Sequence, residues 1–288
     1  MKEPLFTGVC TALVTPFLNH KINYHMMEQL LQRQIDAGIK AIVIAGTTGE
    51  SPTLNDDEKC SLFQFCKDYV GSQCLIIAGT GSNNTAHSIE LSIAAKDCGV
   101  DALLVVSPYY NKATPEGIYQ HYTAICNHVS LPVIIYNVPS RTGLDIPVPV
   151  YQRLSQIPNI AGVKEASNNI TKIARIRNAC GHDLPIWSGN DDQVIPSMAL
   201  GSLGVISVLS NVKPEITASM CNAALDGDFD TASHLQCQML PLIDALFSEV
   251  NPIPVKAALK EIGFDCGDCR LPLCEISKEA LVKLRKYI

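Results

Sequence analysis

The chain has 288 residues, of which 47% are hydrophobic and 17% are charged, and its formal net charge is −6. This composition supplies ample apolar material for a large core and excludes a disordered chain. The mild negative charge comes without a run of basic residues, so we expect no nucleic-acid partner.

The amino-terminal stretch MKEPLFTGVCTALVTPF lacks an apolar run of the kind that secretion signals contain. No run of about 18 uninterrupted apolar residues occurs in the chain, so we expect a cytoplasmic protein without a membrane span. The 12 cysteines lie mostly in apolar segments, as reduced buried thiols do. Cys266 and Cys269 form a C-x-x-C pair, but a zinc site needs further ligands at suitable spacing, so we expect no metal.

Short apolar runs recur along the chain, and each ends in small or polar residues. Their near-continuous Val, Ile and Leu character is typical of strands that are buried on both faces. The eight runs cover residues 8–17, 41–50, 74–81, 102–110, 132–140, 160–167, 185–191 and 204–211.

The segments between these runs have the periodicity of helices with one apolar face. Asn55 and Glu58 have the spacing of a capping box and predict a helix start there. Gly38 predicts a helix end. The expected helices cover residues 26–38, 53–70, 85–99 and 115–129.

The alternation of eight strands with helices favours the α/β class and a (β/α)8 TIM barrel over residues 1–227. An open doubly wound sheet is the alternative, but no G-x-G-x-x-G follows the first strand. After residue 227 the strand pattern stops and helical segments follow. We expect residues 228–288 to form a C-terminal helical extension without an independent core.

Active sites of such barrels lie at the C-terminal ends of the strands. The polar residues of this chain gather after those ends, in GTTGES, YY, YNVPSRTG, KEAS and SGND. Polar residues that are scattered over a surface would not follow the strand ends in this way, so the pattern predicts a site.

Lys164 lies inside the apolar run IAGVKEAS, where a buried charge is costly. A strand lysine ordinarily reaches solvent or pairs with a carboxylate, and Lys164 on its own fits that interpretation. The adjacent Glu165 should project to the opposite face, which makes it a poor partner. The alternative is an amine that desolvation keeps partly neutral, so that it attacks a carbonyl and forms a Schiff base.

Three other positions allow both a structural and a chemical interpretation. Tyr136 is a core aromatic residue, or a phenol that transfers protons beside an amine. The GTTGES segment is a tight turn, or a seat for a carboxylate formed by its hydroxyls and N–H groups. Arg141 is a solvated charge, or a bidentate clamp for a substrate carboxylate. The SGND segment is interpreted as a helix cap through Asn190 or Asp191.

The segments GTTGE, PYYN, YNVPSRTG, GVKEAS, SGND and GVISV, in this order, resemble the dihydrodipicolinate synthase / N-acetylneuraminate lyase family of class I aldolases. The resemblance covers essentially the whole chain. It implies a (β/α)8 barrel with a C-terminal helical extension, no metal, no cofactor, and a pyruvate Schiff base on Lys164.

Within this family, YNVPSRTG points to members that condense pyruvate with L-aspartate 4-semialdehyde in the diaminopimelate route to lysine. Arg141 would then bind the carboxylate of the semialdehyde. The alternative is a member that acts on N-acetylneuraminate or on a 2-keto-3-deoxy-gluconate. A metal-dependent aldolase and a barrel without enzymatic activity are two further alternatives. The sequence shows no convergent His cluster that would hold a metal, which argues against the first. The reactive residues would have no structural purpose in a barrel without activity, which argues against the second.

The resemblance also implies individual functions for the site residues and a homotetramer built as a dimer of dimers. Tyr136 would pass protons, with Thr47 and Tyr110 as relay partners, and Tyr110 would reach in from a neighbouring subunit. Thr48 would hold the pyruvate carboxylate, while Gly189 and Ile206 would line the pocket through their backbone.

Members of the family that lysine inhibits bind it at a subunit interface near the first tyrosine, here Tyr109. Their pocket uses a His and a Glu at positions that align with Asp56 and His87 of this sequence, and Lys59 adds a positive charge. Because a ligand ammonium would be poorly neutralised there, we hypothesise that lysine inhibition is weak or absent.

Overall fold

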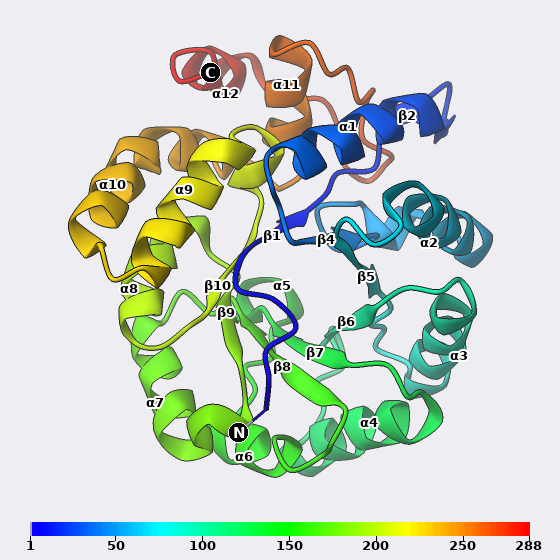
Figure 1. Ribbon diagram of the computed structural model, residues 1–288. Coiled ribbons are helices and arrows are strands. Elements are labelled where there is room, and N and C mark those ends of the chain that lie inside the picture. The colour runs from blue at the N-terminus through cyan, green and yellow to red at the C-terminus, as the bar shows by residue number, and fades with distance from the viewer. Residues whose placement is uncertain (1) are drawn as a thin grey trace.

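A computed structural model describes residues 2–288. Eight parallel strands close into a barrel that is surrounded by helices (Figure 1). This confirms the predicted (β/α)8 barrel, and each of the predicted apolar runs contains one barrel strand. The strands are β1 (Gly8–Ala12), β4 (Ala41–Ile44), β5 (Leu75–Gly79), β6 (Ala102–Val106), β7 (Val133–Asn137), β8 (Ile160–Glu165), β9 (Ile186–Ser188) and β10 (Gly204–Ser207).

The helices of the shell follow the strands in chain order. The capping box before α2 is confirmed, because Asn55 Oδ1 accepts from the Glu58 N–H and Glu58 Oε2 accepts from the Asn55 N–H. The shell helices are α1 (Tyr24–Asp36), α2 (Asp56–Val70), α3 (Thr85–Asp97), α4 (Pro115–His128), α6 (Val148–Leu154), α7 (Ile170–Cys180), α8 (Val194–Ala199) and α9 (Pro214–Leu225).

Two short elements interrupt the predicted pattern. The end of the first apolar run leaves the barrel and forms a hairpin of β2 (Phe17–Leu18) and β3 (Lys21–Ile22). Asn19 and His20 both have positive φ, as a two-residue turn between antiparallel strands requires. The segment after β7 forms the one-turn helix α5 (Pro139–Thr142), which carries Arg141.

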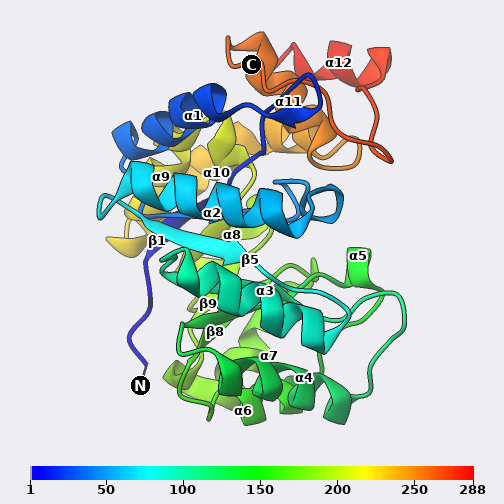
Figure 2. The same cartoon turned by 90° about the vertical axis from the view of Figure 1, so that its right-hand side faces the viewer.

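The chain after the barrel is helical, with α10 (Phe229–Leu246), α11 (Ile253–Glu261) and α12 (Lys278–Leu284). Helix α10 packs along α9, and α11 and α12 lie on the same side of the molecule as α1 (Figures 1 and 2). The expected boundary at residue 227 falls in the turn between α9 and α10, and the division into two units stays a prediction. None of the helices in residues 2–288 is both long and apolar enough to cross a membrane.

Apolar side chains form two layers, one between the strands and the shell helices and one inside the barrel. The inner layer includes Tyr136, Trp187 and Ile206. Phe6 stacks on Trp187 with ring centroids 4.7 Å apart, and the Trp187 indole N–H donates to the Phe6 carbonyl. Phe6 precedes the first strand, so this pair closes the amino-terminal end of the barrel, and space for a ligand remains at the opposite end.

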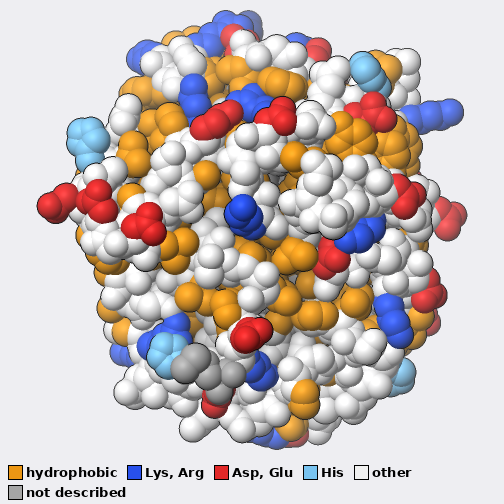
Figure 3. All heavy atoms as spheres, in the orientation of Figure 1, with side chains coloured by type: hydrophobic (Ala, Val, Ile, Leu, Met, Phe, Trp, Pro, Cys, Tyr) orange, Lys and Arg blue, Asp and Glu red, His pale blue; other side chains and the backbone are white. Residues whose placement is uncertain are grey.

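Charged side chains are dispersed on the face of the molecule seen in Figure 3, where Lys and Arg alternate with Asp and Glu. In residues 2–288 we find no group of three or more His, Cys, Asp or Glu side chains with the geometry of a metal site. The thiols of Cys266 and Cys269 are both free.

Candidate active site

The turn after β4 carries Thr47 and Thr48 and is anchored from several sides. Thr48 is buried, and Thr15 Oγ1 donates to the Gly49 carbonyl at 2.7 Å. Glu50 has a left-handed φ of 57° and a fully buried side chain. Its carboxylate accepts from Lys256 Nζ and from the Arg270 N–H, both at 2.8 Å. The turn is therefore held by the barrel on one side and by the C-terminal segment on the other.

Lys164 faces the barrel interior near the carboxyl ends of the strands. In the ladder it is the register partner of Tyr136 on β7 and of Trp187 on β9, and both of these belong to the inner apolar layer. Lys164 is 5% exposed, and its Nζ lies 4.4 Å from the centroid of the Tyr136 ring. The structure thus brings the predicted amine and the predicted phenol together.

Lys164 differs from the other buried lysines in its surroundings. Within residues 2–288 four lysines are buried, and three of them pair with a carboxylate. The pairs are Lys59 with Asp56, Lys172 with Asp145 and Lys256 with Glu50. Lys164 forms no ion pair within the same residues. Its Nζ lies over the face of the Tyr136 ring instead. An unpaired buried amine is costly, so this arrangement is unexplained by stability alone.

Glu165 points to the other face of β8, as its position next to Lys164 predicts. Its carboxylate accepts from Asn137 Nδ2 at 3.0 and 3.1 Å, from the Tyr151 hydroxyl at 3.1 Å and from the Ser167 N–H at 2.9 Å. Burial raises the pKa of the Glu165 carboxyl. These bonds join the ends of β7 and β8 and thereby fix the backbone that carries Tyr136 and Lys164.

Gly189 permits a close approach of the chain to Lys164. Its N–H donates to the Glu165 carbonyl at 2.8 Å. A Cβ at this position would lie 2.6 Å from the Ala166 Cβ and 3.0 Å from Lys164 Cε, so a side chain here would crowd both Ala166 and Lys164. Ile206 is 1% exposed and belongs to the inner apolar layer. It is not among the residues that line either cavity described below, so its contribution to the pocket stays a prediction.

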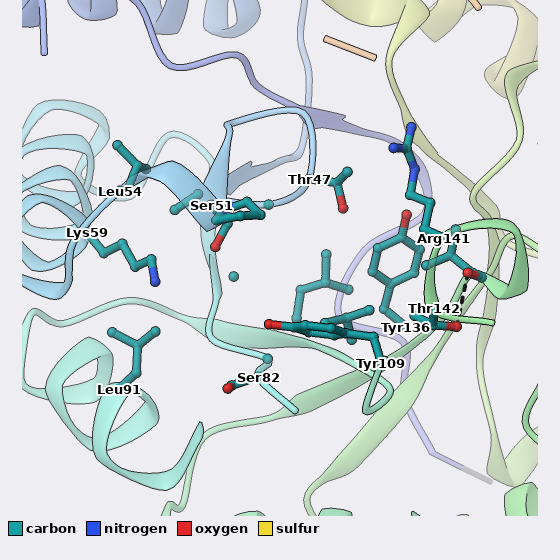
Figure 4. A pocket seen from close by; sticks show the side chains of 18 of the residues that line it. Thr47, Ser51, Leu54, Lys59, Ser82, Leu91, Tyr109, Tyr136, Arg141 and Thr142 are labelled. Atoms are coloured by element: carbon teal, nitrogen blue, oxygen red, sulfur yellow. Dashed lines mark hydrogen bonds between the residues drawn. The ribbon is translucent and has the colours of Figure 1, made fainter. Parts of the chain in front are cut away.

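Two adjoining cavities open at this end of the barrel and share Thr47, Tyr136 and Arg141. The smaller cavity, of about 220 Å³, is also lined by Thr48, Lys164, Gly189 and Asn251. The larger cavity, of about 500 Å³, extends toward α2 and α3. Figure 4 shows the larger cavity, where the hydroxyl groups of Thr47 and Tyr136 face the same space.

Arg141 and Tyr110 occupy more exposed positions. Arg141 lies on α5, is exposed and borders both cavities, which is compatible with the predicted clamp. Tyr110 is 91% exposed, has a φ of 71° and lines neither cavity of its own chain. The structure therefore does not bring Tyr110 to Tyr136 within one chain, and its participation from a neighbouring subunit stays a prediction.

The residues considered for lysine inhibition form one charged cluster at the wall of the larger cavity, near Tyr109. Asp56 accepts from His87 Nε2 at 2.8 Å and lies 3.4 Å from Lys59 Nζ. The hydrogen bond from His87, with a smaller contribution from Lys59, lowers the pKa of the Asp56 carboxyl. The carboxylate of this cluster is thus already engaged by two basic side chains.

The expected helix cap through Asn190 or Asp191 does not form, and one further site residue was missed. Asn190 precedes the helical turn Asp191–Gln193, but its side chain makes no cap hydrogen bond. Asp191 Oδ2 instead accepts from the backbone N–H groups of Val208 and Leu209, at 2.8 and 3.0 Å. It therefore ties the end of β9 to the end of β10, and burial raises its pKa. Asn251 lies between α10 and α11, yet its amide donates to Thr48 Oγ1 at 2.9 Å. No local pattern marks Asn251, because its partner is distant in sequence.

Comparisons with known proteins agree with this geometry. Residues 5–288 match the model of the Dihydrodipicolinate synthetase family. The chain is 46% identical over 286 residues to the 4-hydroxy-tetrahydrodipicolinate synthase of Thermoanaerobacter sp. (strain X514), covering 99% of this chain and 96% of the relative. A solved dihydrodipicolinate synthase from Aquifex aeolicus has a TM-score of 0.96 and 41% identity, with 98% and 96% of the two chains covered. A structure described as the first monomeric dihydrodipicolinate synthase variant has a TM-score of 0.97 and 39% identity, with 98% and 96% covered.

Proposed function

The chain belongs to the dihydrodipicolinate synthetase family, and we propose that it condenses pyruvate with L-aspartate 4-semialdehyde to form 4-hydroxy-tetrahydrodipicolinate. The observation that carries this proposal is the state of Lys164. It is the buried lysine that lacks a carboxylate partner within residues 2–288, and it lies in a cavity against a tyrosine ring. An amine that lies in a cavity without an ion-pair partner is placed to attack a carbonyl carbon as a nucleophile.

The reaction begins when the Lys164 amine attacks the keto carbon of pyruvate and a water molecule leaves, which gives a protonated imine. The positive imine nitrogen withdraws electrons from the pyruvate methyl group, so that a methyl proton is lost and an enamine forms. The enamine carbon then bonds to the aldehyde carbon of the second substrate, whose oxygen takes up a proton. Finally the amine of that substrate replaces Lys164 on the imine carbon, which closes the ring and releases the enzyme.

The neighbouring side chains have distinct functions in this proposal. The Tyr136 hydroxyl passes protons to the oxygen that leaves pyruvate as water and to the aldehyde oxygen of the second substrate, as a phenol beside an amine can do. Thr47 shares the cavity with Tyr136 and serves as its relay partner. Thr48 and the N–H groups of its turn hold the pyruvate carboxylate. Arg141, at the mouth of both cavities, binds the carboxylate of the semialdehyde.

Two features of the chain support this reaction over cleavage of N-acetylneuraminate or of a 2-keto-3-deoxy-gluconate. Arg141 is an exposed cation that borders both cavities, which suits a second substrate that carries a carboxylate. Curated relatives at 41–46% identity across nearly the whole chain are named 4-hydroxy-tetrahydrodipicolinate synthase. In addition, we propose a cytoplasmic homotetramer in which Tyr110 of each chain completes the relay of a neighbour. Its 91% exposure supports this function in a subunit contact.

Reductive trapping tests the proposal directly. Pyruvate and borohydride are added to the protein, and peptide mass spectrometry locates the reduced pyruvyl group. We expect a single adduct on Lys164, and none in Lys164→Arg, which keeps the charge but presents no amine for imine formation. Lys40→Arg, at an exposed lysine outside the barrel mouth, serves as the control and should label normally. A folded wild-type protein that gains no adduct, or an adduct on another lysine, would contradict the mechanism.

A further inference from the structure

We infer that Asn251 is a positioning residue for pyruvate: its side-chain amide holds the hydroxyl of Thr48 so that the hydroxyl proton points at the pyruvate carboxylate. This inference rests on the proposed function, because it presumes that Thr48 binds pyruvate. It assigns to the C-terminal helical extension a part in substrate binding.

Asn251 and Thr48 meet across 203 positions of sequence. Asn251 follows α10, at the start of the segment that leads into α11, whereas Thr48 belongs to the turn after β4. Asn251 Nδ2 donates to Thr48 Oγ1 at 2.9 Å, and the two residues are 5% and 3% exposed. Both residues line the smaller cavity together with Lys164, so this bond is formed at the wall of the reaction site.

The direction of this hydrogen bond determines what Thr48 can offer to a ligand. A hydroxyl has one proton to donate and lone pairs that accept. Because Thr48 Oγ1 accepts from the amide, its own proton is directed elsewhere, and within residues 2–288 no acceptor for it is found. A carboxylate in the cavity is the partner that such a donor suits, since hydrogen bonds to charged groups are the stronger ones.

The side-chain carbonyl oxygen of Asn251 indicates that this residue does not serve to stabilise the fold. Asn251 Oδ1 is buried and has no hydrogen-bond partner in the described part of the chain. A buried acceptor without a partner is costly, and an apolar residue of similar size would avoid that cost. We therefore attribute the presence of an asparagine at position 251 to the N–H group that it donates to Thr48.

The same two segments are joined a second time, which keeps the donor in place. Lys256 on α11 pairs with Glu50, two positions after Thr48, and Lys256 Nζ also donates to the Asp268 carbonyl. Both members of the Lys256–Glu50 pair are buried. The turn that carries Thr48 is thus fixed to the extension by a second contact, at Glu50.

The test replaces the donor of Asn251 by an acceptor of the same shape. In Asn251→Asp the Thr48 hydroxyl donates to the new carboxylate and turns its proton away from pyruvate. We expect the pyruvate concentration for half-maximal borohydride trapping, and the KM for pyruvate, to rise about 10- to 150-fold, which is the value of one hydrogen bond to a charged group. Asn251→Leu removes the donor without adding charge and should raise both values less. The KM for the semialdehyde should stay at the wild-type value.

A double-mutant cycle with Thr48→Val separates this effect from charge repulsion. If Asn251 acts through the Thr48 hydroxyl, Asn251→Asp adds little to the defect of Thr48→Val. If the Asn251→Asp defect is undiminished in that background, the inference is overturned. Asn178→Asp, at an exposed position of α7, introduces the same change of charge and should leave both KM values unchanged.

Three further outcomes are decisive. If Asn251→Asp binds pyruvate as the wild type does, the inference is overturned. The proposed function is not affected by that result, as long as the wild-type protein forms its adduct on Lys164. Equal rises in both KM values together with a lowered unfolding temperature would assign Asn251 a merely structural function and would also overturn it. Failure of the wild-type protein to form any adduct would refute the proposed function itself.

Discussion

Lys164 and Tyr136 are register partners on adjacent strands, and the amine lies 4.4 Å from the centre of the tyrosine ring. A ring face attracts an ammonium more weakly than a carboxylate does, and it fixes the position of the amine without binding its proton in an ion pair. The pairing therefore places a nucleophile and a proton donor at the same level of the barrel. The predictions below follow from this arrangement and from the contacts around it.

Tyr136→Phe keeps the ring against Lys164 and removes only the hydroxyl. We expect kcat to fall by about 10²- to 10⁴-fold, the usual contribution of a positioned proton-transfer group. The rate of borohydride trapping with pyruvate should fall as well, because imine formation also needs proton transfer. Thermal unfolding should change little. A variant with wild-type kcat would exclude Tyr136 from the relay.

Arg141→Ala should separate the two substrates. Loss of a charge-assisted bond to the semialdehyde carboxylate should lower kcat/KM for the semialdehyde about 10- to 150-fold. Trapping with pyruvate alone should be unchanged, since Lys164 and Thr48 are untouched. Arg141→Lys, which retains the charge without the bidentate geometry, should have an intermediate effect. Equal losses for both substrates would contradict the assignment of Arg141 to the second substrate.

Gly189→Ala should impair imine formation by displacing the amine. The added Cβ would lie 2.6 Å from the Ala166 Cβ, closer than carbon atoms pack in proteins, and 3.0 Å from Lys164 Cε. Overpacking of this kind costs about 1–3 kcal/mol of stability, and the displaced amine should lower the trapping rate further. The matched control is Gly117→Ala on α4, where the nearest neighbour of the new Cβ is 3.4 Å away. Normal trapping by Gly189→Ala would show that the close approach has no function.

L-Lysine should inhibit weakly or not at all. The Asp56 carboxylate, the acidic group of the cluster, is engaged by His87 and Lys59, so the ammonium groups of a ligand would meet two basic side chains. Initial rates measured against increasing L-lysine, at constant ionic strength, test this hypothesis. An inhibition constant well below about 1 mM, equivalent to more than about 4 kcal/mol of binding, would refute it.

Lys256→Met should destabilise the fold. Glu50 would remain fully buried without its partner, and breaking a buried ion pair in this way costs about 3–5 kcal/mol. The double variant Glu50→Gln, Lys256→Met removes both charges and should recover a large part of that loss. Denaturant unfolding of both variants measures the difference. Equal stability of Lys256→Met and the wild type would show that Glu50 finds another partner or solvent.

The barrel could be predicted from the sequence because its determinants are local. The apolar runs that became strands are continuous in the chain, and the capping box before α2 involves residues only three positions apart. The burial of Lys164 and the outward direction of Glu165 follow from the period of a strand in the same way. The hairpin of β2 and β3 was missed, since each strand has only two residues and the turn between them depends on the positive φ of Asn19 and His20.

The tertiary structure alone decided which buried lysine lacks a counter-ion and which residue directs Thr48. In the sequence Lys172 and Lys256 have the same charge as Lys164, and only folding brings Asp145 and Glu50 to them. Lys59 differs, because Asp56 lies three positions before it on α2. Asn251 meets Thr48 across 203 positions, and Asp191 binds backbone N–H groups in the segment that follows β10 instead of capping its own helical turn. Local periodicity determines which face a side chain takes, whereas its partners come from segments that only the closed barrel and its extension bring within hydrogen-bond distance.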